Sequence, residues 1–103
     1  MSEIHVLVVD DEKEIADLVE IYLVSDGYKV YKASNALEGL EILEKETIHL
    51  VLLDIMMPGM DGLALLKQIK QRHPMLPVII MTAHSDLDAA VSAYQQGAFD
   101  YLP

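Results

Sequence analysis

Short apolar runs alternate with longer segments of mixed polarity along the whole chain. The runs have the length of β-strands and cover residues 4–9, 28–31, 50–53, 78–81 and 99–102. The first is almost continuously apolar, which is typical of a parallel strand buried on both faces of a sheet. The pattern therefore predicts five strands.

The segments between these runs carry apolar residues at helical spacing. Four helices are predicted from the sets Ile15, Leu18, Val19 and Tyr22; Leu37, Leu40 and Leu43; Leu65, Leu66 and Ile69; and Leu87, Ala90, Val91 and Tyr94. The N-terminal caps expected for the last three are Asn35, Asp61, and Ser85 or Asp86. Helix ends are expected near Gly27, Pro74 and Gly97.

Five strands alternating with four helices imply one parallel α/β sheet with right-handed crossovers. The chain has 103 residues and no linker or repeat, so a single domain spanning residues 1–103 is expected. In such sheets, ligands bind outside the carboxyl ends of strands, where the strand order reverses. Asp10, Asp11, Asp54 and Thr82 all follow predicted strand ends, so a site is predicted there.

Composition narrows the class of protein. The chain has no cysteine, which excludes disulfides, thiolate metal sites and a cysteine nucleophile. No apolar stretch approaches the roughly 20 residues that cross a bilayer, and the N-terminus lacks the basic start of a secretory signal. A cytoplasmic protein is therefore expected. P-loop, GxGxxG and GxSxG motifs are absent, which disfavours nucleotide binding and serine hydrolysis.

The formal net charge of −10 argues against direct binding to nucleic acid or to an anionic membrane. The charge is unevenly placed, since residues 1–62 hold 14 acidic and 4 basic side chains and residues 63–103 hold 3 of each. A solvated acidic face on the first helices would explain this. Different ancestry of the two parts is the alternative.

Asp54 is the most informative residue of the predicted site. It ends an apolar run and stands too early to cap the helix that opens near Gly62. Clustered carboxylates raise one another's pKa unless a cation intervenes. Mg²⁺ suits three such acids, and the Met56 backbone carbonyl is a further candidate ligand. Asp10 and Asp11 alone would be weak evidence, because acids after a strand commonly cap the next helix.

Thr82 could donate a hydrogen bond to a phosphoryl oxygen on Asp54. Without the acids, a β-branched residue that only finishes a strand would be the preferred interpretation. The histidines are scattered without metal-ligand spacing and are interpreted as incidental. They are His5, His49, His73 and His84.

Four segments resemble the receiver domains of bacterial two-component response regulators: residues 8–12, 53–62, 80–83 and 97–103. The resemblance implies a flavodoxin-like, doubly wound parallel sheet of order 2-1-3-4-5. It implies that Asp54 is the phosphoacceptor and that Asp10, Asp11 and the Met56 carbonyl hold Mg²⁺. Thr82 would then be the switch hydroxyl and Tyr101 the switch aromatic residue. The implied partner is a sensor histidine kinase, and the output domain is absent from this chain.

From about Pro58 onward the chain resembles the receivers of nitrogen-regulation activators, whereas the first part is more similar to receivers of winged-helix regulators. Together with the uneven charge, this predicts a chimera. In the family, a lysine, a proline and a last helix follow the position of Pro103. A C-terminally truncated receiver is therefore expected, with exposed apolar surface that favours a homodimer or a swapped oligomer.

The resulting prediction is a domain that is not an enzyme beyond its own phosphorylation and dephosphorylation, and that switches an output surface. Two alternatives stay open. The chain could be a truncated or engineered α/β fragment without signalling competence. A Mg²⁺-dependent phosphatase is disfavoured, because such enzymes place two acids two residues apart after the first strand, whereas Asp10 and Asp11 are adjacent.

Overall fold

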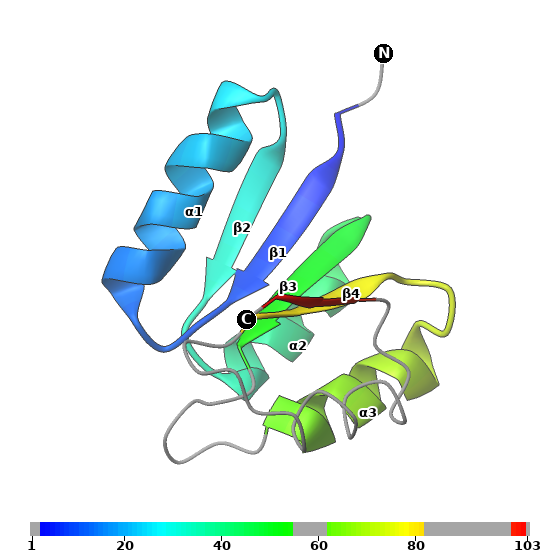
Figure 1. The fold of residues 1–103 in the computed structure, drawn as a ribbon. Helices are drawn as coiled ribbons and strands as arrows, with labels where there is room; N and C mark the ends of the chain where they lie inside the picture. Colours follow the sequence, from blue (N-terminus) through cyan, green and yellow to red (C-terminus); the bar gives the residue numbers. More distant parts are fainter. Residues whose placement is uncertain (1–2, 55–61, 82–99, 103) are drawn as a thin grey trace.

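A computed structural model of the chain describes residues 3–54, 62–81 and 100–102. The elements follow one another as β1 (His5–Val9), α1 (Lys13–Ser25), β2 (Lys29–Ala33), α2 (Ala36–Lys45), β3 (Leu50–Asp54), α3 (Gly62–Arg72), β4 (Val78–Met81) and β5 (Asp100–Leu102) (Figure 1). The alternation predicted from the sequence is thereby confirmed from β1 to β4. The fourth predicted helix lies outside the described residues.

The five strands form one parallel sheet in the order β2-β1-β3-β4-β5, as the family resemblance implied. The chain runs from β1 outward to β2 and then returns to the other side of β1 to form β3. The strand order therefore reverses between β1 and β3, which is the point where ligands bind in open α/β sheets.

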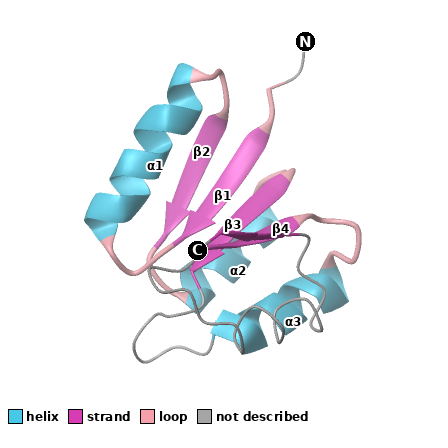
Figure 2. Ribbon diagram, viewed as in Figure 1, coloured by secondary structure: helices cyan, strands magenta, loops and turns pink. Residues whose placement is uncertain are grey.

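Helices cover both faces of this sheet, with α1 on one face and α2 and α3 on the other (Figure 2). Successive side chains of a strand point to opposite faces of the sheet. In β1, Val6 and Val8 therefore pack on the α1 side, and Leu7 and Val9 pack on the opposite face. The larger buried cluster lies under α2 and α3 and includes Leu53, Leu65, Leu66, Ile69 and Ile80. Leu65, Leu66 and Ile69 belong to α3 and are the residues whose spacing predicted this helix.

The predicted apolar face of the first helix is confirmed only at Val19. Leu18 and Tyr22 are 53% and 67% exposed, and the side that packs on the sheet carries Ala16, Val19 and Leu23. The small side chain of Ala16 lies against β-branched strand residues, so the bulky residues one turn away point outward. The exposed apolar row is in keeping with self-association, which stays a prediction.

The second helix matches its prediction in part. Leu43 is buried and Leu40 partly buried, but Leu37 is 68% exposed. Its predicted cap is confirmed, because the Asn35 side chain accepts a hydrogen bond from the Glu38 backbone N–H at 2.9 Å. Gly39 lets α2 approach β1 closely, since an added Cβ would lie 3.3 Å from Val9 Cγ2.

Removing this cap tests the local assignment. We expect Asn35→Ala to lower the free energy of unfolding by about 1 kcal/mol, because an N–H at the start of α2 loses its acceptor. Urea denaturation measures the change. Asn35→Asp keeps a side-chain acceptor and should retain most of the stability, so equal losses in the two variants would contradict the role of the cap.

Candidate acidic site

Three carboxylates meet at the carboxyl edge of the sheet. Asp10 directly follows β1 and Asp54 is the last residue of β3, and the two strands are paired with Val9 beside Leu53. The arrowheads of β1 and β3 reach the same edge (Figure 1). Asp11 is the next residue after Asp10. The predicted convergence of these acids therefore follows from strand register at the point where the sheet order reverses.

The carboxylate groups of Asp10, Asp11 and Asp54 each place one oxygen within 4.8 Å of the others. Asp10 is only 3% exposed, whereas Asp54 is partly exposed and Asp11 is exposed. In the described part of the chain, no other group of three His, Asp or Glu side chains is so placed. The cluster thus combines one buried acid, Asp10, with the partly exposed Asp54 and the exposed Asp11.

The alternative role considered for Asp10, that of a helix cap, is wrong, because Asp10 does not cap α1. The N-cap is Glu12, whose side chain makes no capping hydrogen bond. Asp10 Oδ1 instead accepts the Glu12 backbone N–H at 2.9 Å, which fixes its carboxylate just before the helix starts.

Burial raises the pKa of Asp10 from 3.8 to about 6. The Glu12 N–H acts in the opposite direction, while the nearby charges of Asp54 and Asp11 raise the pKa further. A divalent cation would remove this penalty, since it needs one or two carboxylates and oxygen ligands. The residues present therefore fit a hard cation such as Mg²⁺.

The raised pKa makes the stability of the metal-free domain depend on pH. The folded chain binds the Asp10 proton more tightly than the unfolded chain, so the ionised carboxylate destabilises the fold above its folded pKa of about 6. We expect the contribution of Asp10 to the free energy of unfolding to rise by about 1 kcal/mol between about pH 7 and pH 5. The difference in the free energy of unfolding between wild type and Asp10→Asn isolates the contribution of the Asp10 carboxylate. A difference that stays constant over the range would contradict it.

Other predicted site residues are placed less fully. Met56 and Thr82 lie outside the described residues. Tyr101 belongs to β5, where it pairs with Ile80 of β4, the strand that leads toward Thr82.

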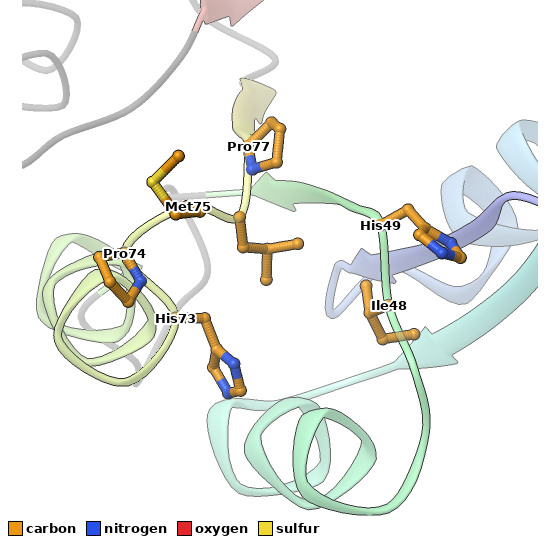
Figure 3. A pocket seen from close by; sticks show the side chains of 7 residues that line it. Ile48, His49, His73, Pro74, Met75 and Pro77 are labelled. Carbon is orange, nitrogen blue, oxygen red and sulfur yellow. The ribbon is translucent and has the colours of Figure 1, made fainter.

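The side chains of His5 and His49 take part in hydrogen bonds at the opposite, amino end of the sheet. The His5 N–H donates to His49 Nδ1 at 2.9 Å, and the His5 ring lies 2.7 Å from the Thr47 carbonyl. His49 and His73 line an open hollow of about 400 Å³ there, on opposite sides of it (Figure 3). His84 lies outside the described residues.

The sequence interpretation missed a pocket beside Asp10, which Lys13 and Lys32 help to line. The spacing of three residues between Asp10 and Lys13, across a helix start, was the available signal. Lys32 lines the pocket because β2 pairs with β1, which brings it near Asp10. Its position could not be predicted without knowledge of the fold.

The helices that the structure describes are too short or too polar to span a bilayer.

Comparisons with known proteins agree with these observations. Residues 6–103 match the family described as Response regulator receiver domain. The DNA-binding transcriptional regulator NtrC of Escherichia coli is 66% identical over 98 residues, which cover 95% of this chain and 21% of that protein. The putative response regulator NtrX-like of Rickettsia bellii is 41% identical over 104 residues, covering 99% of this chain and 22% of that protein.

Solved structures give the same result. The CheY-like receiver domain protein of Methanospirillum hungatei has a TM-score of 0.92 and 35% identity, covering 98% of this chain and 81% of its own. NtrX of Brucella abortus, in complex with ADP, also has a TM-score of 0.92, with 41% identity over 98% of this chain and 23% of its own. The chain spans about one fifth of the length of the curated relatives it matches.

The expectation of a chimera with a winged-helix type of first half is not supported. One natural protein, NtrC, matches 95% of the chain, which includes most of both parts. The simpler explanation of the uneven charge has direct support, because acids of the first two helices such as Glu14, Glu41 and Glu44 are exposed.

Proposed function

The chain belongs to the response regulator receiver domain family, and on that premise we propose that Asp54 accepts a phosphoryl group from a sensor histidine kinase. The observation that carries the proposal is the convergence of Asp10, Asp11 and Asp54 where the strand order reverses. Asp54 is the most suitable nucleophile of the three, because it is partly exposed at the end of β3 while Asp10 is buried.

In the proposed reaction, a carboxylate oxygen of Asp54 attacks the phosphorus atom of the donor. A new O–P bond forms as the bond between phosphorus and the donor nitrogen breaks, and the nitrogen keeps the electron pair and takes up a proton. Asp10, Asp11 and the Met56 carbonyl would hold Mg²⁺, which supplies positive charge to the phosphoryl oxygens. The contribution of the chain is mainly to position the donor and to neutralise charge.

The acyl phosphate adds about −1.5 to −2 charges at Asp54. We assign Thr82 and Tyr101 to the switch that responds to it, by a hydrogen bond from the Thr82 hydroxyl to a phosphoryl oxygen. The name of NtrC states DNA binding, and we assign that activity to regions of such regulators beyond the receiver. We also propose a cytoplasmic location, which suits a sensor histidine kinase as partner.

Incubation with Mg²⁺ and acetyl phosphate tests the proposal. The expected product has gained the mass of one phosphoryl group, in an adduct that survives acid and is lost in base. Absence of any adduct would favour the alternative of an α/β module without signalling competence. Repeated turnover of a phosphate monoester would favour an aspartyl phosphatase instead.

A further inference from the structure

A pocket of about 230 Å³ lies beside the acidic cluster, and we refer to it as the side pocket. It is lined from the start of α1, the end of β2 and the first turn of α2, with Asp10, Lys13, Lys32, Ser34 and Glu38 among its residues. Asp10 belongs both to the side pocket and to the acidic cluster, so the two spaces adjoin. The pocket is lined from β2, which flanks β1 on the side opposite to β3. It therefore lies on the side of Asp10 away from Asp54, the last residue of β3.

The side pocket contains one cation that is not held by a carboxylate. All seven Lys and Arg residues of the chain fall within the described residues, and only Lys13 and Lys32 line this pocket. Lys32 Nζ is bound to Asp17 Oδ1 at 2.8 Å and to Glu20 Oε1 at 2.9 Å.

Lys13 has no hydrogen-bond or ion-pair partner in the described part of the chain. Its charge acts on Asp17 only at a distance, where it lowers the Asp17 pKa less than Lys32 does. Lys13 is exposed, so its ammonium is accessible to a ligand that enters the side pocket.

A small phosphoryl donor places an anionic leaving group next to the site of transfer. In-line attack by Asp54 on acetyl phosphate forms the Asp54 O–P bond and breaks the bond from phosphorus to the acyl oxygen. Acetate departs with that electron pair, on the side of the phosphorus away from Asp54. The side pocket, with a volume of about 230 Å³, has room for acetate. The ammonium of Lys13 carries the positive charge that can pair with the acetate carboxylate.

We propose that Lys13 is a specificity-determining residue that pairs with the carboxylate leaving group of small acyl phosphates in the side pocket. The inference rests on the proposed phosphoacceptor function. It predicts a preference among donors, because phosphoramidate releases its nitrogen as neutral ammonia after protonation and gives the Lys13 ammonium no carboxylate to pair with.

The experiment compares phosphorylation rates of wild type and Lys13→Met with acetyl phosphate and with phosphoramidate, at saturating Mg²⁺. We expect Lys13→Met to slow the reaction with acetyl phosphate by about two- to fivefold, the scale of one exposed ion pair. The rate with phosphoramidate should be unchanged. Lys13→Arg should keep the acetyl phosphate rate. Lys45→Met removes the same charge from the far end of α2 and serves as the matched control.

Equal rates for wild type and Lys13→Met with both donors would overturn the role of Lys13. Equal slowing with both donors would also overturn it, because that result indicates general attraction of anions. If wild type forms no adduct with either donor, the proposed function itself fails. Mg²⁺-induced stabilisation of Lys13→Met verifies that the variant is folded, so a loss of rate can be assigned to the side chain.

Discussion

Replacing Asp54 with Asn is expected to abolish the phosphoryl adduct. The amide of Asp54→Asn has no anionic oxygen for attack on phosphorus, and the other two acids are poorly placed to substitute for it. Asp10 is buried and bound to the Glu12 N–H, while Asp11 is exposed and lies outside the strand end. Incorporation from acetyl phosphate should fall by at least about 100-fold, since the chemical step loses its nucleophile. Intact-protein mass spectrometry measures it directly.

Asp26→Asn provides the control, because Asp26 is an exposed acid at the end of α1, the opposite end from Asp10. This variant should be phosphorylated as wild type is. Far-ultraviolet circular dichroism should show that Asp54→Asn is folded. An adduct of full yield on folded Asp54→Asn would mean that another side chain accepts the phosphoryl group, and the assignment of the nucleophile would fall.

The architecture could be predicted from the sequence because the apolar runs of the strands and the acids that end two of them agree. Buried parallel strands are apolar on both faces, so β1 and β3 stand out as uninterrupted runs, and each run ends at an acid. Asn35 was recognisable as a cap from its position alone. The meeting of Asp10 with Asp54 followed once the strand order was known, since the register of β1 and β3 puts the two strand ends side by side.

The face of α1 could not be read in the same way. Ile15, Leu18 and Tyr22 form a regular apolar series, and periodicity alone cannot show whether such a series faces the sheet or the solvent. The contact with the sheet is made through Ala16, a small residue that a hydrophobic pattern barely registers. The position of Lys13 could not be predicted for a related reason. Its ammonium is distinguished from that of Lys32 only by the fold, in which Lys32 pairs with Asp17 and Glu20.

The second large effect is expected for Asp10→Asn, and its sign should depend on Mg²⁺. Without the cation, the ionised Asp10 carboxylate is buried beside Asp54 and Asp11, which raises its pKa to about 6. Removing that charge should raise the free energy of unfolding at neutral pH by about 2 kcal/mol. The amide oxygen can still accept the Glu12 N–H, so the local turn is kept.

With Mg²⁺ the order of stability should reverse. Binding to the folded chain alone stabilises it by an amount that grows with the ratio of free cation to Kd, about 2.7 kcal/mol at a hundredfold excess over Kd. Wild type gains this term, whereas Asp10→Asn loses the buried anionic ligand, and its Mg²⁺ affinity should fall by roughly 100-fold. Thermal unfolding with and without Mg²⁺ should therefore show wild type as the less stable protein without the cation and as the more stable one in excess cation.

Glu41→Gln supplies the comparison that makes this crossing diagnostic. Glu41 is an exposed acid on α2, so its neutralisation removes the same formal charge far from the buried carboxylate. The stability of Glu41→Gln should stay within about 0.5 kcal/mol of wild type, with an unchanged response to Mg²⁺. If Asp10→Asn behaved in the same way as Glu41→Gln, the three carboxylates would not be a cation site, and the phosphotransfer chemistry proposed for Asp54 would lose its physical basis.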